Sequence, residues 1–502
     1  MPSNKPFNPH AHPSARTVIL DLKGKDATFW KRKGEQRALA IFKAAAARVP
    51  AYKDFLKKNK VNPERVTSYA HFQEVPPTDK KNYIKEYPLK DLAWDGKLDH
   101  PSVFTSTSGS TGEQTYFFRS SLVDWQCSIL QEIFIENSLT PRKPTLVVVC
   151  FGMGIWIGGI ITYEAITRLG ERGFPTSIIT PGINKAEIFK ALKKLAPSYH
   201  QTIIFGYPPF LKDLIDEAAD WGINFSKMNV RFSTAAESYS EDYRDFLGKA
   251  VKLKDPVLDI MSIYGSADIG AMGFESPTSI SIRRLARKDK KFSAKLFVST
   301  QKTPTLAQFV PTFINFEEVE GELYLTGSNS IPLVRYAIGD HGGVYSHKEM
   351  TSLLREFKYN IPRVRNDKFK NMELPFVYVF ERNDFSTTLY GAQIYPEAIR
   401  EVLIKNPFVK LLSGKFTLLT KYTEKHDQYL EINLELAREQ RISKIARAQL
   451  LDHIIKNLML KNSEFRELHR FIGKRALPKL MFWDHEDPNF FKPGIKQQWV
   501  KK

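Results

Sequence analysis

The sequence predicts an α/β protein with a large N-terminal part and a smaller C-terminal part. Three observations support this prediction. The chain has 502 residues, enough for roughly two to four domains. Strand-like apolar runs alternate with amphipathic helical runs through its middle, as in layered α/β domains. A boundary near residues 381–384 then separates this alternation from a hairpin pattern and a helix.

The elements follow in order along the chain. Residues 29–60 have a helical pattern that Pro50 interrupts, and residues 209–221 form a second helix candidate. The predicted strands are short apolar runs, at residues 146–151, 202–206, 230–234 and 259–264, with shorter ones at 322–326 and 332–337. In the C-terminal part, residues 415–436 predict a hairpin that turns at 424–427. Apolar residues every four positions from Ile442 to Leu458 then predict a helix.

The uncharged stretch Thr145–Tyr163 is long enough to suggest a membrane span. Four glycines interrupt it, so we interpret it as a buried strand, a glycine-rich turn and a helix that continues through Glu164. The polar N-terminus argues against a secretory signal. With Cys127 and Cys150 alone, no disulfide framework is expected, and a cytoplasmic setting fits.

The composition is that of a globular, basic protein. It is 42% hydrophobic, which excludes a disordered chain. It carries 74 Lys and Arg against 55 Asp and Glu, for a net charge of +19. Such a surface suits polyanionic ligands, nucleic acid or an anionic membrane without choosing among them.

Residues 105–112 have the chemistry of a phosphate-binding loop. They place six hydroxyl side chains and two glycines in eight residues, which gives many donors and lets the backbone approach phosphate oxygens. The loop lacks the Gly-Lys-Ser/Thr end of a Walker A motif. Taken alone, the segment is equally consistent with a flexible polar loop.

Two aspartates follow predicted strands. Asp268 comes just after the strand that ends near Tyr264, and ligands in open α/β sheets bind at that edge. Asp340 stands after a strand and a glycine, where a carboxylate can accept ribose hydroxyls. For either residue alone, an aspartate in a turn is the simpler interpretation. Near the C-terminus, Lys492, Lys496, Lys501 and Lys502 could reach a phosphate or form a solvated basic tail.

Taken together and in this order, these segments resemble the adenylate-forming superfamily, and most closely the phenylacetate-CoA ligase family. The resemblance covers nearly the whole chain. The segments that carry it are Val49-Pro50-Ala51-Tyr52, Thr107–Thr115, Phe151–Gly159, Ala235-Ala236-Glu237-Ser238, Tyr264–Asp268, Tyr336–Asp340, Arg382-Asn383-Asp384 and Gly391–Pro396. Each motif is modest alone, and their order and spacing make coincidence unlikely.

The resemblance implies an AMP-forming acid–CoA ligase. Such an enzyme uses Mg-ATP to convert a carboxylic acid, here an aryl or apolar one, into an acyl adenylate, and then transfers the acyl group to the thiol of coenzyme A. It also implies a large ATP- and acyl-binding domain at residues 1–381 with a helical start at 27–95, a hinge at 382–384, and a small mobile α+β domain at 385–502. ATP, Mg²⁺ and CoA are thus the expected ligands, with no nucleic acid and no membrane span. The oligomeric state, monomer or homodimer, stays open.

The resemblance also assigns roles to residues of this chain. The expected phosphate loop is Thr107, Ser108, Gly109, Ser110, Thr111 and Gly112. Asp268 is the expected Mg²⁺ ligand, and Lys496 is the expected catalytic lysine. The expected adenine and ribose residues are Ala236, Glu237, Tyr264, Asp340 and Arg382. Asp384 is the expected hinge. The expected acyl pocket is formed by Trp156, Phe205, Tyr207 and Gly265, although Trp156 and Phe205 fit core packing equally well.

The chain also departs from the family pattern. Asp268 stands where Glu is usual, Glu381 replaces the usual hinge glycine, and residues 277–316 have no counterpart. Lys492 is the second candidate for the catalytic lysine. Two other functions remain open from the sequence: an amide ligase with an amine acceptor, and a non-catalytic protein whose basic face binds nucleic acid or an anionic membrane.

Overall fold

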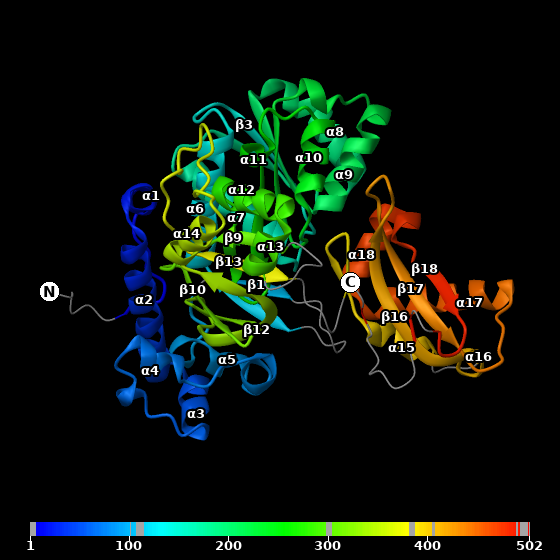
Figure 1. Cartoon of the computed structure of the whole chain (residues 1–502), viewed down its shortest axis with the longest axis horizontal. Coiled ribbons are helices and arrows are strands. Elements are labelled where there is room, and N and C mark those ends of the chain that lie inside the picture. The colour runs from blue at the N-terminus through cyan, green and yellow to red at the C-terminus, as the bar shows by residue number, and fades with distance from the viewer. Residues whose placement is uncertain are drawn as a thin grey trace.

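A computed structural model describes residues 7–100, 102–106, 115–297, 304–380, 387–403, 407–487, 490–491 and 500. Figure 1 shows N-terminal helices on one side, a large central sheet with helices packed on it, and a smaller part with its own sheet on the other side. This arrangement agrees with the predicted α/β class and with a separate small α+β part.

The chain begins with helices, as predicted. They are α1 (Ala15–Gly24), α2 (Ala27–Arg48), α3 (Pro50–Lys58), α4 (Tyr69–Gln73) and α5 (Leu89–Leu92), with a single π-helical turn at Lys80–Ile84. The Asp26 side chain accepts a hydrogen bond from the N–H of Phe29 and caps α2. Helix α2 ends before Pro50, which starts α3 as a first-turn proline.

A hairpin and a buried helix follow. Strands β1 (Ser102–Ser106) and β2 (Tyr116–Ser120) pair antiparallel on either side of residues 107–114. Helix α6 (Ser121–Ser138) begins directly after β2 and is buried along most of its length.

The parallel half of the main sheet has the order β4-β3-β5-β6-β7. Its strands are β3 (Thr145–Cys150), β4 (Thr176–Ile179), β5 (Gln201–Gly206), β6 (Val230–Ala235) and β7 (Ile260–Ser266). Its helices are α7 (Ile157–Glu171), α8 (Lys185–Leu195), α9 (Pro208–Glu217), α10 (Glu241–Ala250) and α11 (Pro256–Asp259). The predicted strands at 146–151, 202–206, 230–234 and 259–264 are confirmed within a residue or two.

The other half of the sheet is antiparallel and continues from β7 in the order β8-β9-β13-β12-β11-β10. Its strands are β8 (Gly270–Phe274), β9 (Thr305–Gln308), β10 (Ile314–Val319), β11 (Glu322–Gly327), β12 (Leu333–Tyr345) and β13 (Phe376–Phe380). Helices α12 (Pro277–Lys288), α13 (Lys290–Phe297) and α14 (His347–Glu356) belong to this half.

The predicted strand at 332–337 is present, but its predicted length is wrong, because β12 is 13 residues long and runs through Asp340. Its pairing with β11 shifts register between Tyr324 and Glu322, so that extra residues around Gly339 bulge out of the ladder. Gly339 has a φ of +81°, which a glycine adopts without strain. The glycine thus marks a bulge within a strand rather than the end of a strand.

The small part has a β14–β15 hairpin and a three-stranded sheet in the order β16-β17-β18. Its strands are β14 (Thr387–Leu389), β15 (Ala392–Ile394), β16 (Leu412–Tyr422), β17 (Gln428–Leu436) and β18 (Lys479–Trp483). Its helices are α15 (Pro396–Leu403), α16 (Phe408–Leu411), α17 (Lys444–Lys461) and α18 (Ser463–Ile472). The predicted hairpin at 415–436 and the helix over 442–458 are confirmed.

The uncharged stretch at 145–163 is split between β3 and α7, as expected. Among the residues that the structure describes, no helix is both long and apolar enough to cross a membrane. A single cluster of buried apolar side chains runs from one face of β3, β5 and β6 into the small part, where it includes Leu389, Ile394 and Leu430. The two parts therefore share an apolar contact.

Candidate active site

The candidate site lies where the parallel strands end. Strands β5, β6 and β7 run in the same direction, so their carboxyl ends meet at one edge of the sheet. Tyr207, Glu237 and Asp268 each follow one of these strands. In open α/β sheets, this edge is where ligands bind.

Asp268 lies in the turn between β7 and β8 and is 3% exposed. The Tyr336 hydroxyl donates a hydrogen bond of 2.7 Å to its Oδ2 atom. The Nζ atom of Lys80 lies 3.2 Å from its Oδ1 atom. The carboxylate predicted to face a metal-bound phosphate is therefore buried, held on one oxygen by a hydroxyl and paired on the other with a cation.

The N-terminal helices bring Lys80 to this carboxylate. Thr78 forms an isolated parallel bridge with Tyr336, in which the Thr78 N–H donates to the Arg335 carbonyl and the Ala337 N–H donates to the Thr78 carbonyl. The Thr78 hydroxyl also donates to the Val334 carbonyl at 3.0 Å. The segment before Lys80 is thus attached to β12, next to the tyrosine that holds Asp268.

Asp340 projects from the β12 bulge and is 8% exposed. Its Oδ2 atom accepts a hydrogen bond of 2.7 Å from the Tyr264 hydroxyl. The Tyr264 ring stacks on Phe316, with ring centroids 6.1 Å apart. The structure thus brings two predicted nucleotide-binding residues, Tyr264 and Asp340, into direct contact.

Glu237 connects the large part to the small part. It follows Ala236, whose φ of +72° turns the chain sharply after β6. The Gly391 N–H donates to its Oε1 atom, and the Gln428 side-chain amide donates to its Oε2 atom at 2.9 Å. Both oxygens of this predicted adenine-side residue are therefore engaged by the small part. Its proposed contact with adenine stays a prediction.

The predicted acyl-pocket residues have different surroundings. Tyr207 packs on Phe151, with ring centroids 5.1 Å apart, and its hydroxyl accepts a hydrogen bond from the Gly152 N–H at 3.5 Å. Burial raises the pKa of the Tyr207 hydroxyl, and the nearby carboxylates of Glu464 and Glu237 raise it further. The phenol therefore stays neutral at physiological pH.

The other three predicted pocket residues lie at the start of α7, on β5 and on β7. Trp156 is the residue that precedes α7. Phe205 is 1% exposed on β5 and belongs to the buried core. A side chain at Gly265 would place its Cβ atom 2.7 Å from the Gly270 carbonyl oxygen, so only glycine fits the close approach of β7 and β8. The structure leaves the acyl-pocket assignment as a prediction.

Several predicted residues lie outside the described part of the chain. They are Thr107, Ser108, Gly109, Ser110, Thr111 and Gly112 of the phosphate loop, Arg382 and Asp384 of the hinge region, and the lysines Lys492 and Lys496. The strands that flank the loop are described, and Phe117 on β2 lies with its ring centroid 5.8 Å from the Lys80 Nζ atom. The base of the predicted loop is therefore next to Asp268.

Sequence reasoning missed Lys80 and the role of Tyr336 at Asp268. A local signal for the Lys80 turn exists, because Asp79 and Asn82 have the spacing of an N-terminal capping pair. That pair predicts a helix start, but nothing local says which carboxylate the following lysine meets.

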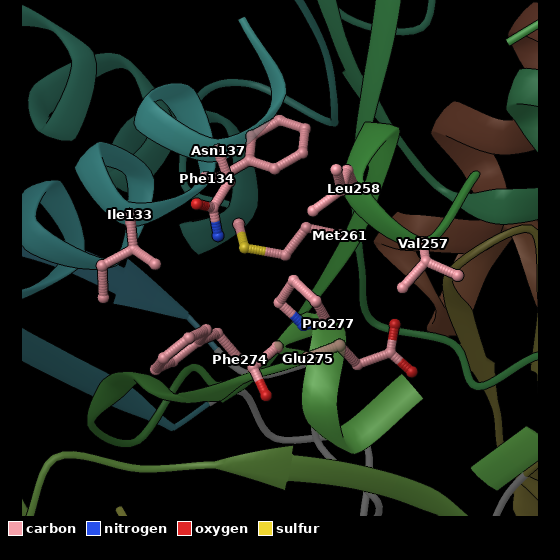
Figure 2. Close-up of a pocket in the computed structure, with 10 residues that line it drawn as sticks. Ile133, Phe134, Asn137, Val257, Leu258, Met261, Phe274, Glu275 and Pro277 are labelled. Carbon is pink, nitrogen blue, oxygen red and sulfur yellow. The ribbon is translucent and has the colours of Figure 1, made fainter. Parts of the chain in front are cut away.

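Two cavities differ in what they could accept. A cavity of about 440 Å³ lies between the two parts, and Glu237, Tyr239, Tyr243, Gln428 and His426 are among its lining residues. A second gap of about 10 Å³ lies among α6, α11, β7, β8 and the start of α12, where the side chains of Phe134, Met261 and Pro277 lie close together (Figure 2). The second gap has room for about one water molecule, so the first is the candidate ligand space.

Ion pairs also join the two parts. Arg475 of the small part lies 2.6 Å from the Asp213 carboxylate and 3.2 Å from the Glu217 carboxylate. Asp427 of the β16–β17 turn lies 2.8 Å from the Nζ atom of Lys212. These contacts hold the small part against α9.

The fold matches solved structures of a CoA ligase. A structure of 2-hydroxyisobutyryl-CoA ligase with 2-HIB-AMP and CoA, in its thioesterification state, matches with a TM-score of 0.62 at 15% identity, over 99% of this chain and 94% of that chain. The fold is that of the adenylate-forming CoA ligases.

Other states of the same ligase overlap less with this chain. Its open conformation with the same two molecules gives a TM-score of 0.53 at 15% identity, over 99% of this chain and 97% of that chain. Its postadenylation state gives 0.51 at 13% identity, over 99% of this chain and 94% of that chain. No protein-family model and no curated protein sequence matches the chain.

The residues at Asp268 fit a magnesium ion that arrives with a nucleotide. Mg²⁺ usually takes one or two protein carboxylates, with phosphate oxygens and waters completing its octahedron. Asp268 supplies one buried carboxylate, and among the described residues no group of three or more His, Cys, Asp or Glu side chains forms a self-sufficient metal site. Asp268 therefore fits a metal held jointly with ATP rather than an all-protein site.

Proposed function

We propose that this chain is an AMP-forming acid–CoA ligase that activates a carboxylic acid with Mg-ATP and transfers the acyl group to the thiol of coenzyme A. The observation that carries the proposal is the pair of tyrosine-held aspartates. Asp268 and Asp340 are buried at the ligand-binding edge of a sheet whose fold matches an acyl-CoA ligase over 99% of the chain.

In the first step, an oxygen of the substrate carboxylate attacks the α-phosphorus of ATP. The bond between that phosphorus and the bridging oxygen breaks, so pyrophosphate leaves and an acyl adenylate remains. No protein nucleophile is required, and the catalysis comes from positioning and from electrostatic stabilisation of the phosphates. Magnesium, when bound with ATP, neutralises part of the phosphate charge.

Each residue of the site has a proposed task in this step. Asp268, oriented by Tyr336, holds the metal-bound phosphates, and Asp340, oriented by Tyr264, accepts the ribose hydroxyls. Residues 107–112 bind the terminal phosphates. Lys496 links the substrate carboxylate to the α-phosphate, with Lys492 as the alternative, and Arg382 binds the ribose.

In the second step, the thiolate of coenzyme A attacks the acyl carbon and AMP leaves. The small part, which begins after a hinge at residues 382–384 with Asp384 as the pivot, has to turn so that the thiol can enter. In this structure the small part is docked against α9. Two findings support this docked arrangement as the one for the second step. The TM-score is higher against the thioesterification state than against the postadenylation state, and a cavity of about 440 Å³ lies between the two parts.

The acid is proposed to be aryl or apolar, because aromatic side chains line the predicted pocket at Trp156, Phe205 and Tyr207. Pyrophosphate release with a panel of aryl, alkyl, hydroxy and amino acids, with and without CoA, tests the proposal. Release with one class of acid, followed by CoA-dependent thioester formation, is the expected result.

Two other results would change the conclusion. If CoA fails as acceptor while an amine yields an amide, the chain is an amide ligase. If folded protein releases no pyrophosphate with any acid, the ligase proposal is wrong. A binding function on the same fold then becomes the leading explanation, with salt-sensitive binding to nucleic acid or anionic vesicles as its test.

A further inference from the structure

Helix α12 begins the segment 277–316, which has no counterpart in the family pattern. One of its side chains, Arg283, is 1% exposed. Its Nη1 atom donates hydrogen bonds to the Glu241 carboxylate on α10 at 3.0 Å and to the Glu275 carboxylate just after β8 at 2.5 Å. A buried cation therefore joins this segment to the rest of the large part.

Arg244 of α10 contacts the same two carboxylates. Its Nε atom donates to Glu241 at 3.0 Å, and its Nη2 atom donates to Glu275 at 2.5 Å. Two cations and two anions thus alternate around a closed cycle, which we call the charge network, and all four side chains are at most 1% exposed. Dehydrating these charges costs much of what their attraction returns, so the complete network adds little net stability for its size.

The charge network holds the loop that follows β6. The Nη2 atom of Arg283 donates to the Tyr239 carbonyl at 2.5 Å, and the guanidinium carbon of Arg244 lies 5.0 Å from the centroid of the Tyr239 ring. Arg244 also donates to the Ile260 carbonyl at the start of β7 at 2.6 Å, which anchors the network to the sheet. Both the backbone and the side chain of Tyr239 are therefore held by arginines of the network.

Tyr239 belongs to one wall of the cavity between the two parts. The loop after β6 and the first turn of α10 contribute Glu237, Ser238, Tyr239, Ser240 and Tyr243 to the lining of this cavity of about 440 Å³. Glu237 and its neighbour Ala236 are predicted adenine-side residues. Because a displacement of about 1 Å can misplace a bound ligand, the position of this loop decides how well a nucleotide fits.

We propose that Arg283 is a positioning residue for the nucleotide. Through the Tyr239 carbonyl, it fixes the cavity wall against which the adenosine of ATP and AMP binds. Arg283 is 1% exposed, so it acts through Tyr239 rather than by touching the nucleotide. The segment without a counterpart thus sets nucleotide affinity from behind the wall. This inference rests on the proposed function.

The competing explanation is that the charge network only stabilises the fold. A residue that only stabilises changes the melting temperature and leaves nucleotide affinity unchanged well below that temperature. A residue that positions the adenosine wall changes the affinities for ATP and AMP by the same factor, because both molecules carry adenosine. Inorganic pyrophosphate lacks adenosine, so its affinity reports on the phosphate side alone.

The test uses Arg283→Lys, which keeps the charge. A lysine has a single ammonium group, which lacks the planar fork that contacts both carboxylates and the Tyr239 carbonyl. Arg284→Lys is the matched control, because Arg284 is the next residue of α12 and also contacts Glu241, but its second partner is Asp245 rather than the loop. If Arg283→Lys does not fold, the double variant Arg283→Gln with Glu275→Gln replaces it, since it keeps two polar side chains and removes one charge of each sign.

Affinities for ATP, AMP and pyrophosphate are measured by calorimetry well below the melting temperature of each variant, together with KM and kcat for pyrophosphate release. We expect Arg283→Lys to weaken ATP and AMP binding equally, by about 3- to 10-fold, which corresponds to one hydrogen bond. The KM for ATP should rise by the same factor, while kcat changes less than about twofold. Pyrophosphate affinity, and every affinity of Arg284→Lys, should also change less than about twofold.

Three results would overturn the inference while the wild-type protein still binds AMP and releases pyrophosphate. They are an unchanged AMP affinity in Arg283→Lys, a loss for ATP without one for AMP, and equal losses in Arg283→Lys and Arg284→Lys. A wild-type protein that neither binds ATP nor releases pyrophosphate would overturn the proposed function, and this inference with it.

Discussion

Replacing Arg475 with alanine should weaken the contact between the small and large parts. The Arg475 guanidinium lies 2.6 Å from Asp213 and 3.2 Å from Glu217, both on α9. Lys185 also pairs with these two carboxylates, at 3.2 and 2.8 Å, and belongs to the large part itself. The substitution therefore removes one link between the parts without leaving Asp213 as an unpaired buried charge.

The exposures of the partners set the size of the effect. The Asp213 side chain is 1% exposed, but that of Arg475 is 41% exposed, so solvent screens the pair. Partly exposed ion pairs contribute about 1 kcal/mol at most, and Lys185 compensates some of the loss. A loss of about 1 kcal/mol would shift the docking equilibrium by about fivefold, so about fivefold is the upper limit of the expected effect.

Half-reactions measured separately show where the effect falls. We expect Arg475→Ala to slow thioester formation from supplied acyl adenylate by about two- to fivefold, because that step is proposed to need the small part docked against α9. Pyrophosphate release should change less than about twofold. Raising NaCl from about 50 to about 300 mM should slow the wild-type thioester step and affect the variant less, because salt screens the pair that the variant lacks.

Lys474→Ala is the matched control, since it removes the same charge from the neighbouring residue. Lys474 is exposed and forms no ion pair with any residue that the structure describes. The reasoning is refuted if Arg475→Ala and Lys474→Ala behave alike, or if Arg475→Ala slows both half-reactions equally.

Three further substitutions have expected outcomes. Gly391→Ala should lower thioester formation at least about tenfold, since Gly391 has a φ of +83° and a Cβ atom there would lie 2.5 Å from the Tyr207 ring. Burial raises the pKa of Glu464 from 4.5 to about 7. The folded protein therefore keeps the Glu464 proton to higher pH than the unfolded chain does, and the free energy of unfolding falls as the pH rises from about 4.5 to about 7. Melting curves should therefore show that the free energy of unfolding of Glu464→Gln rises by on the order of 2 kcal/mol relative to that of wild type as the pH goes from about 5 to about 8. Arg283→Met should lower the free energy of unfolding by about 3–5 kcal/mol and lower the melting temperature, because it leaves the buried carboxylates of Glu275 and Glu241 with one cation fewer.

Each of these has a control on the same element or an outcome that would contradict it. Equal thioester rates for wild type and Gly391→Ala would show that the Tyr207 contact does not matter for this step. Glu467→Gln, one turn further along the surface of α18, should leave the pH dependence of melting unchanged. Arg287→Met should lower the free energy of unfolding by less than about 0.5 kcal/mol, since the side chains of its partners Asp242 and Asp245 are 74% and 42% exposed.

Local patterns were sufficient to predict most elements of the fold. Strands β3 and β5 are buried at every position, and the apolar residues of each form an uninterrupted run, as is typical of strands that are covered on both faces. Strand β12 was predicted too short. A glycine inside a strand and a glycine at its end look the same in one sequence, and only the pairing with β11 distinguishes them.

The candidate site was predictable as far as its residues follow strand ends. Asp268 was named from that position, and it does follow the end of β7. Asp340 was named on the same ground but lies in a bulge within β12. The tyrosines that hold the two aspartates were not assigned this task. Lys80 and its contact with Asp268 depend on a bridge between Thr78 and Tyr336, which are separated by more than 250 residues. No local propensity encodes such a pairing, because it arises from how the N-terminal helices dock on the sheet.

The contacts around Tyr207 connect the predicted acyl pocket to the small part. On one side Tyr207 packs on Phe151 and the Gly152 backbone, which belong to the glycine-rich segment after β3. On the other side its ring faces Gly391, so closely that no side chain fits between them. The Gly391 N–H is bound by Glu237, which follows β6. The small part thus contacts Tyr207, a residue of the predicted acyl pocket, through a glycine, and a change in the docking of the small part would alter the surroundings of the Tyr207 ring directly.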